Sequence, residues 1–421
     1  MLYEKWRQVV RARANELALV DPATGRRWTF AQLSAWEEAG ELPAIPWACP
    51  QGIVPEFIVT VLRAWRVGRV VCPLEAGQST PVLPPPPPGC VHLKSTSATT
   101  GNARCVAFTA GQLAADAENI VATMGLRSDS PNLGVISLSH SYGFSNLILP
   151  LLLHGIPLHL AESPLPEPMR QALSQSRQWT VPAVPALWRT WHEAGILSPA
   201  IRLAISAGAP LPLPLEQSVW DQNSLKLHNF YGATECGGIA YDRTGIPRAD
   251  AAVVGTALDG VQLSIGPEGC LEVAGAAVGM TYWPEPRATL AERCYRTSDR
   301  VELRDGTVRL LGRASDQINV AGRKLAPESV EQVLAAHPSV AECLVFGVPA
   351  MTAERTEVIV ACVANRHPTP IEELRNFLLA RLPAWQTPKE WWLVDSLETT
   401  SRGKLSRAAW RERYLARREK S

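Results

Sequence analysis

Short apolar runs alternate with amphipathic segments through the middle of the chain. Four runs rich in branched apolar residues predict buried strands, at 133–138, 156–161, 203–206 and 225–230. Between them, 112–124 and 144–153 carry apolar residues at the spacing of a helix that faces a core. Strands that alternate with helices predict an α/β fold, in which a mainly parallel sheet is flanked by helices.

The first ninety residues follow a different pattern. The stretch "LALVDPATGRRWTFAQL" predicts a strand, a glycine turn, a second strand and a helix, and "FIVTVLRAWRVG" followed by "RVVCPL" predicts a helix and a short strand. Residues 84–88 are five consecutive prolines. Such a run has no backbone N–H to donate, so we interpret 81–89 as a stiff connector of polyproline type. A ligand for an SH3-like module is the alternative interpretation.

Beyond residue 300 the pattern becomes that of a small α+β unit. Alternating residues around Asp305-Gly306 predict a hairpin over 300–312. Pro327 opens a predicted helix, which is followed by further elements at 342–348, 357–364, 371–381 and 390–394. We therefore expect a large N-terminal domain over 1–312 and a small C-terminal domain over 316–421.

Polar or glycine-containing segments follow three of the predicted parallel strands. They are "SHSYG" at 139–143, "AGAP" at 207–210 and "YGATE" at 231–235. Ligands of open α/β sheets collect beyond the carboxyl ends of the strands. The three segments therefore predict a binding site at one edge of the sheet.

Composition narrows the class of protein. The 421 residues carry a net charge of +1, which gives no reason to expect nucleic acid as a partner. The basic stretch is 402–421, interpreted as a solvated helix face or, alternatively, as a contact for an anionic partner. The run "SNLILPLLLHG" is too short to span a bilayer. Nine scattered cysteines and no signal-like start indicate reduced thiols and a cytoplasmic location.

The stretch "KSTSATTGNARC" at 94–105 is an unusually polar segment between apolar runs. Five of its residues carry hydroxyl groups, and it precedes a predicted helix. Hydroxyls and backbone N–H groups in such a loop can surround phosphate oxygens. The segment lacks the GK[ST] ending of a Walker A motif, and taken alone it is also typical of an ordinary surface loop.

Seven motifs in one order carry a resemblance to a known family. They are "TSATTGNAR" (96–104), "SHSYG" (139–143), "SAGAPLP" (206–212), "YGATE" (231–235), "YRTSD" (295–299), "GRASDQINVAGRK" (312–324) and "SRGKLSR" (401–407). Together they resemble the adenylate-forming superfamily of acyl- and aryl-CoA ligases, luciferases and peptide-synthetase adenylation domains. The resemblance extends over residues 16–407.

The resemblance implies a two-step reaction. A carboxylate attacks the α-phosphate of ATP and expels pyrophosphate, which gives an acyl-adenylate, and a thiol then takes the acyl group from AMP. The implied cofactors are ATP, Mg²⁺ and coenzyme A, or a carrier-protein phosphopantetheine in place of coenzyme A. Because the first step brings anions together, the site needs cations and hydrogen-bond donors.

The resemblance also assigns roles to single residues. Tyr231 would lie against adenine, Thr234 would donate to the α-phosphate, and Glu235 would hold Mg²⁺. Lys404 would bridge the carboxylate and the α-phosphate, and His140 would border and gate the acyl pocket. The remaining nucleotide- or thiol-binding candidates are Thr96, Ser97, Thr99, Thr100, Gly101, Arg104, Gly208, Ala209, Pro210, Asn229, Gly232, Asp299, Arg313 and Gly322, of which Asp299 and Arg313 would hold the ribose and Gly322 would admit the thiol arm. Taken singly, each of these residue types is also typical of ordinary core or surface positions.

Two features depart from the family pattern. Ala98, Arg104 and Ser315 replace the usual glycine, lysine and hinge residue, which puts the rate of the reaction in question. The phosphate loop begins near residue 95, so we expect a first subdomain that lacks one or two βα units of about 30 residues each. In this family the C-terminal domain is a mobile lid that rotates between the two half-reactions.

Three functions stay open from the sequence. They are an acyl- or aryl-CoA ligase, a ligase that loads a carrier protein, and a degenerate nucleotide-binding protein. The "SHSYG" segment lacks the aspartate that anchors an α-amine in amino-acid adenylation domains, so we expect an acid without that amine. The small or apolar pocket candidates fit an aryl or fatty acyl group, and they are Phe144, Ala207, Gly208, Gly232 and Gly237.

Overall fold

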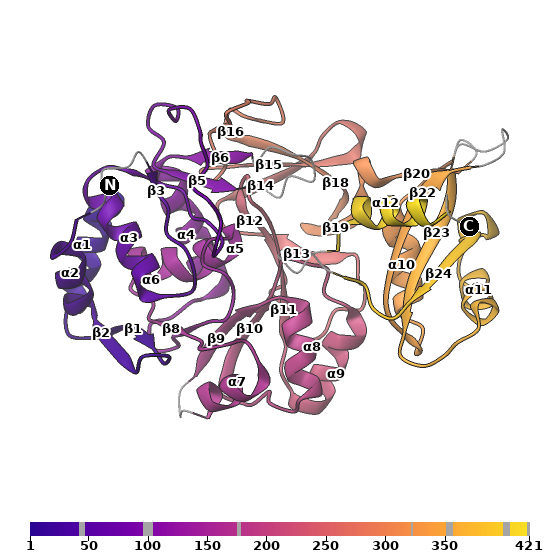
Figure 1. The fold of residues 1–421 in the computed structure, drawn as a ribbon, viewed down its shortest axis with the longest axis horizontal. Coiled ribbons are helices and arrows are strands. Elements are labelled where there is room, and N and C mark those ends of the chain that lie inside the picture. Colours follow the sequence, from indigo (N-terminus) through magenta and orange to yellow (C-terminus); the bar gives the residue numbers. More distant parts are fainter. Residues whose placement is uncertain are drawn as a thin grey trace.

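A computed structural model describes residues 1–41, 47–95, 104–174, 178–320, 323–350, 357–398 and 405–418 (Figure 1). Its largest sheet has the strand order β14-β15-β18-β19-β13-β12-β11-β10-β9-β7-β8-β1-β2, and β17 pairs with β18 at its side. A second sheet has the order β16-β6-β5-β4-β3. Helices cover the sheets, so the predicted α/β class is confirmed.

The parallel half of the large sheet contains the predicted alternation of strands and helices. Its inner pairs, from β1 through β8, β7, β9 and β10 to β11, are all parallel. The strands are β7 (Asn132–Gly134), β8 (Leu158–Leu160), β9 (Trp179–Ala183), β10 (Ile201–Ser206) and β11 (Leu227–Ala233). The helices that accompany them are α4 (Ala110–Met124), α5 (Ser141–Gly143), α6 (Leu149–His154), α7 (Pro166–Leu173), α8 (Pro185–Glu193) and α9 (Leu213–Asn223).

Three predictions in this half need correction. The strand expected over 133–138 ends at Gly134, because its neighbour β8 ends at Leu160, the partner of Gly134. The helix expected over 144–153 begins with a π-helical segment, Phe144–Ile148, before α6. Pro150 has no N–H for a regular i→i−4 bond, which accounts for the wider turn before it. β11 extends through Ala233, so Tyr231 lies in the strand and not after it.

The N-terminal segments contribute strands to both sheets, since β1 and β2 belong to the large sheet and β3 to β6 belong to the second. The predicted strand–turn–strand–helix is confirmed as β1 (Leu17–Asp21), β2 (Arg26–Thr29) and α2 (Phe30–Glu38), and α1 (Leu2–Arg13), which was not predicted, precedes them. The helix expected around residue 60 is α3 (Pro55–Arg66). The second sheet consists of β3 (Trp47–Ala48), β4 (Val70–Val71), β5 (His92–Ser95), β6 (Cys105–Phe108) and β16 (Thr281–Trp283). In this sheet, β16 pairs with β6, so residues 281–283 pair with a strand from the first quarter of the chain.

The antiparallel half of the large sheet confirms the predicted hairpin. β18 (Cys294–Arg304) and β19 (Thr307–Arg313) are joined by Asp305 and Gly306, whose φ angles of 49° and 75° are those of a tight hairpin turn. The other strands are β12 (Gly237–Tyr241), β13 (Val253–Ala257), β14 (Val261–Ile265), β15 (Cys270–Gly275) and β17 (Leu290–Ala291).

The C-terminal part, drawn in orange to yellow in Figure 1, has its own apolar core. Val330 and Leu334 of one helix are fully buried against Val345 and Ala361 of the neighbouring sheet. Its elements are β20 (Ile318–Val320), β21 (Arg323–Leu325), α10 (Pro327–Ala335), β22 (Val340–Pro349), β23 (Glu357–Asn365), α11 (Ile371–Leu379), β24 (Glu390–Val394) and α12 (Arg407–Arg418). The predicted α+β pattern is confirmed, whereas the exact domain limits stay a prediction.

Two general expectations also have structural outcomes. All nine cysteines are free thiols. Within the described ranges, none of the helices combines the length and apolar character needed to cross a membrane.

Candidate functional site

The ends of β10 and β11 form the centre of the candidate site. Ser206, the last residue of β10, pairs with Asn229 of β11, so the 207–210 segment begins beside the last four residues of β11. Gly208 has a φ of 86°, a backbone conformation that favours glycine. The candidates Gly208, Ala209 and Pro210 therefore follow the end of β10, where Ala207 N–H donates to the Ala183 carbonyl of β9 at 3.1 Å.

Three candidates from three different strands contact one another. The Tyr231 hydroxyl donates to Asp299 Oδ2 at 2.5 Å, and Arg313 Nε donates to Asp299 Oδ1 at 3.1 Å. Asp299 and Arg313 are direct cross-strand partners in the β18–β19 hairpin. Burial, and then the charge of Asp299, raises the pKa of Tyr231 well above its ordinary value, so the phenol stays protonated. These three residues are called the Tyr231 trio below.

The turn between β11 and β12 carries Thr234 and Glu235. Gly237 follows it with a φ of 73°, and a Cβ there would come within 2.0 Å of Asp116 Oδ1. Asp116 in turn accepts from the N–H of Gly238 at 3.3 Å. Glycine at position 237 thus lets the turn close tightly against the Asp116 side chain of α4.

The Asp116 side chain that contacts this turn is itself part of a buried ion pair with Lys94. Asp116 Oδ2 lies 3.4 Å from Lys94 Nζ and accepts from Ser145 Oγ at 2.5 Å, and Lys94 Nζ lies 3.0 Å from Ser145 Oγ. Lys94 and Asp116 are each 2% exposed. Lys94 is the first residue of the polar stretch noted in the sequence, but its burial was not expected.

Glu235 has a tyrosine partner that sequence reasoning missed. Its Oε1 accepts from the Tyr282 hydroxyl at 2.9 Å. Burial, and then the charge of Glu235, raises the pKa of Tyr282 above its ordinary value. Tyr282 lies on β16 and meets Glu235 through tertiary packing alone, so no local signal identifies it.

His140 contacts an unexpected carboxylate. Its Nε2 lies 3.2 Å from Glu75 Oε1, and the same oxygen accepts from Ser137 Oγ at 2.9 Å and from Ser139 Oγ. Glu75 follows the short strand β4, so the rule that ligands lie beyond strand ends could have identified it.

Seven candidates lie outside the described residues. They are Thr96, Ser97, Thr99, Thr100, Gly101, Gly322 and Lys404. Arg104 is described and is half-buried just before β6. Gly232 is needed where it lies, because a Cβ there would be 2.7 Å from the Gly237 carbonyl oxygen.

One arginine of the basic C-terminal stretch is not solvated. Arg407, the first residue of α12, contacts Asp316 and lies 3.1 Å from Glu328 and 2.9 Å from Glu331. Its side chain is 19% exposed. The helix is confirmed, but Arg407 does not belong to a solvated face, because three carboxylates surround this residue.

The described residues contain no group of three or more His, Cys, Asp or Glu side chains that could hold a metal ion. A single carboxylate such as Glu235 nevertheless fits Mg²⁺, which takes one or two protein carboxylates and completes its shell with phosphate and water. The donor type at Glu235 is therefore compatible with the predicted ion.

Comparison with known proteins gives two family matches and several relatives. Residues 78–283 match the family described as AMP-binding enzyme, and 329–404 match AMP-binding enzyme C-terminal domain. The human mitochondrial malonate–CoA ligase ACSF3 is 27% identical over 368 residues, 75% of this chain and 64% of that protein. The 4-hydroxybenzoate–CoA/benzoate–CoA ligase of Rhodopseudomonas palustris is 26% identical over 347 residues, 76% of this chain and 64% of that protein. This chain thus spans less than two thirds of the length of these relatives.

Solved structures agree on the fold. ATP-bound MatB from Rhodopseudomonas palustris has a TM-score of 0.84 at 20% identity, over 98% of this chain and 99% of that chain. The o-succinylbenzoate CoA synthetase of Bacillus subtilis, in complex with its acyl-adenylate intermediate, has a TM-score of 0.82 at 20% identity, over 96% of this chain and 97% of that chain. These structures show the fold, and the two family matches show that the chain belongs to the family of AMP-binding enzymes.

Proposed function

We propose that this protein activates a carboxylic acid with ATP and transfers the acyl group to the thiol of coenzyme A. The observation that carries the proposal is the Tyr231 trio, in which an aromatic ring, a carboxylate and a guanidinium converge beside the turn that bears Glu235. Such a group suits adenosine, since the ring offers a stacking face and the carboxylate accepts hydrogen bonds from ribose hydroxyls.

In the first step, a carboxylate oxygen of the acid bonds to the α-phosphorus while the bond from that phosphorus to the bridging oxygen breaks. Pyrophosphate leaves with the electron pair of that bond. The Thr234 hydroxyl and the Lys404 ammonium would donate to oxygens of the α-phosphate, where negative charge gathers. Glu235 would hold Mg²⁺, which when bound supplies neutralisation of phosphate charge.

In the second step, the acceptor thiol loses its proton to water and its sulfur bonds to the acyl carbon, while AMP leaves with the electron pair of the carbon–oxygen bond. His140 would border the path to the acyl carbon, and Glu75 keeps the imidazole in place through the 3.2 Å contact. The loop that includes Gly322 would admit the thiol arm after rotation of the C-terminal domain.

The substrate we propose is an aryl or fatty acid without an α-amine. Glu75 lies 3.2 Å from His140, so if His140 borders the acyl group as proposed, the Glu75 carboxylate would oppose a second carboxylate on the substrate. We therefore expect benzoate or octanoate to be better substrates than malonate, although the relatives include malonate–CoA ligases.

The test is pyrophosphate release with ATP, Mg²⁺ and a panel of acids, followed by trapping with hydroxylamine. Release with at least one acid supports the proposal, and no release with any acid favours the degenerate nucleotide-binding alternative. Coenzyme A and a phosphopantetheinylated carrier protein are then compared as acceptors, because loading of a carrier protein is the second candidate. We also propose that the protein is cytoplasmic.

A further inference from the structure

The carboxylate of Asp116 in α4 accepts hydrogen bonds from three other segments of the chain. Its Oδ1 atom accepts from the Gly238 N–H at 3.3 Å, and its Oδ2 atom accepts from Ser145 Oγ at 2.5 Å. Lys94 Nζ lies 3.4 Å from the same Oδ2 atom and donates to Ser145 Oγ at 3.0 Å. Lys94, Asp116 and Ser145 therefore form a closed triangle of contacts, which we call the Asp116 cluster.

Each partner of Asp116 lies close in sequence to a different motif of the candidate site. Lys94 is the first residue of the polar stretch at 94–105, and Ser145 follows the 139–143 segment by two positions. Gly238 lies three positions after Glu235. Since none of the three partners is itself a candidate site residue, these contacts concern how the motifs are held and not what they bind.

The contact with Gly238 holds one side of the turn that carries Thr234 and Glu235. The backbone of this turn is also held elsewhere, because the Glu235 carbonyl accepts from the Gly279 N–H at 2.8 Å. Cys236, which follows Glu235, is 1% exposed, so the turn is fixed in part by a buried side chain. The position of the Glu235 backbone therefore depends on contacts with distant elements, and Asp116 supplies one of them.

The Lys94–Asp116 ion pair has an energetic cost that stability alone does not explain. Both side chains are 2% exposed. Taking two charges out of water costs several kcal/mol for each ion, and apolar residues of similar volume are often as stable or more stable in such places. A charged acceptor nevertheless gives short, strong hydrogen bonds to its donors. The geometry that the pair imposes on its neighbours therefore explains it better than the free energy of unfolding does.

Ser145 lies in an irregular stretch of helix. It belongs to the π-helical segment Phe144–Ile148, which directly follows α5. π-Helical turns are rare and are frequently found at functional sites. Within this segment, the Ser145 hydroxyl contacts both Lys94 and Asp116. The irregular helix is an observation separate from the ion pair, and it concerns the same cluster.

We propose that Asp116 is a positioning residue for the adenylation step, an inference that rests on the proposed ligase function. Asp116 acts through the turn that carries Glu235, whose place it sets by the 3.3 Å contact just beyond that turn. Lys94 and Ser145 hold the carboxylate in the orientation that this contact needs. A displaced turn should therefore slow adenylation, in which Glu235 is proposed to act, and leave the transfer to the thiol unchanged.

Two double variants separate the contact from the charge. Lys94→Met with Asp116→Asn removes both charges but keeps an acceptor for the Gly238 N–H, whereas Lys94→Met with Asp116→Ala removes that acceptor as well. In the alanine variant, the rate of pyrophosphate release should fall roughly 10- to 30-fold, because one positioning hydrogen bond is lost. In the asparagine variant, it should stay within about threefold of the parent. Transfer from preformed acyl-adenylate to coenzyme A should stay within about twofold in both variants.

Hydrogen exchange gives a readout that does not depend on activity. In the resting protein, the peptide that spans residues 231–241 should exchange faster in the alanine variant, because the Gly238 N–H loses its acceptor. In the asparagine variant it should exchange at the rate of the parent. Glu118→Gln is the matched control, because it removes a carboxylate from the same helix that lies 3.8 Å from His154 instead. This control should change neither the exchange nor the release of pyrophosphate.

The outcomes separate this proposal from the proposed function. If no acid releases pyrophosphate, the proposed function fails, and calorimetric titration with ATP still tests Asp116, since the alanine variant alone should lose the gain in affinity that Mg²⁺ provides. Unchanged exchange at 231–241 in the alanine variant would overturn the positioning role. Equal losses in adenylation and in thiol transfer would also overturn it, because they would indicate a general loss of structure. An asparagine variant as impaired as the alanine variant would do the same, because the charge would then carry the effect.

Discussion

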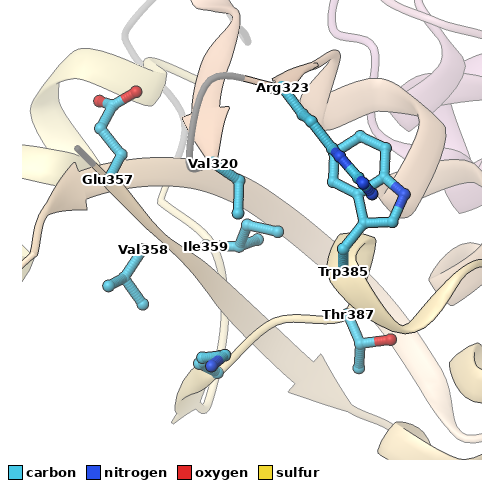
Figure 2. A pocket seen from close by; sticks show the side chains of 8 residues that line it. Val320, Arg323, Glu357, Val358, Ile359, Trp385 and Thr387 are labelled. Atoms are coloured by element: carbon cyan, nitrogen blue, oxygen red, sulfur yellow. The ribbon is translucent and has the colours of Figure 1, made fainter. Parts of the chain in front are cut away.

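The Tyr231 trio and a cavity of the C-terminal part contain similar residue types but pair their charges differently. The cavity, called the Trp385 pocket, is lined by Arg323, Glu357, Trp385 and Lys389 among others (Figure 2). Both bring an aromatic side chain, a carboxylate and at least one cation into a small space. In the trio, Asp299 accepts from both of its neighbours, so the charges are paired within the protein. In the Trp385 pocket, the cations have no carboxylate partner in the described chain, and a buried hydroxyl is unpaired.

The difference indicates what each site can recognise. A carboxylate that is already held in place offers its remaining acceptor capacity to neutral hydroxyl groups, such as those of a ribose. Uncompensated cations instead favour a ligand that brings its own negative charge. The trio therefore suits the sugar of a nucleotide, whereas the Trp385 pocket suits an anionic group.

The largest expected effect separates the ATP reaction from acceptor transfer. Lys404→Ala should lower the rate of adenylation by roughly 100- to 1,000-fold, because one cation that stabilises the α-phosphate oxygens is lost. Transfer from preformed acyl-adenylate to coenzyme A should persist, as measured by single-turnover kinetics. Equal losses in both steps would contradict the role given to Lys404.

The next effect tests whether the trio serves ATP alone. Asp299→Ala should raise the KM for ATP roughly 10- to 100-fold, since hydrogen bonds to a charged group contribute about 1.5–3 kcal/mol each. The KM for coenzyme A should not change. Glu302→Ala is the control, because it removes a carboxylate from the same strand that pairs with Arg304 and Arg309 instead. If the KM for coenzyme A rises together with the KM for ATP, Asp299 does not serve ATP alone.

A smaller effect tests the pairing inside the trio. Tyr231→Phe keeps the ring but removes the hydroxyl that donates to Asp299, and it should raise the KM for ATP about fivefold, which corresponds to about 1 kcal/mol. Tyr241→Phe on the neighbouring strand β12 should leave the KM unchanged. No change in the Tyr231 variant would mean that the hydroxyl does not position Asp299.

The smallest effect concerns the unpaired hydroxyl of the Trp385 pocket. Thr387→Val should leave the KM for coenzyme A unchanged, because the buried Oγ1 atom offers no surface that a ligand could contact. The free energy of unfolding should stay equal or increase by up to about 1 kcal/mol, because a buried unsatisfied group is removed. Chemical denaturation measures this quantity. A loss of more than about 1 kcal/mol would show that the hydroxyl stabilises the fold.

Local patterns were sufficient for most of the fold. The alternation of strands and helices, the Asp305-Gly306 hairpin and the helix at Pro327 are all encoded within short windows of sequence. The π-helical turn before Pro150 and the early end of β7 were not predicted, because they depend on a missing N–H and on the length of a neighbouring strand.

The candidate site was predictable only where a motif carried it. Tyr231 and Asp299 are 68 positions apart, and their contact follows from the register of strands that no periodicity reveals. Tyr282 donates to Glu235, and Asp116 accepts from Gly238 just beyond the same turn, and neither contact has a local signal in the sequence. The Trp385 pocket combines residues from three separate segments, so only the folded chain shows it.

The ion pairs of Arg313 and Arg407 limit which backbone positions can rotate between the two parts of the chain. Arg313 is bound to Asp299 in the large sheet, whereas Asp316 is bound to Arg407 of the last helix. Only Ala314 and Ser315 lie between these two anchors. A reorientation that preserves both ion pairs must therefore occur by rotation about the backbone torsion angles of these two small residues. Replacing either one with proline would fix its φ angle and restrict the two parts of the chain to fewer orientations.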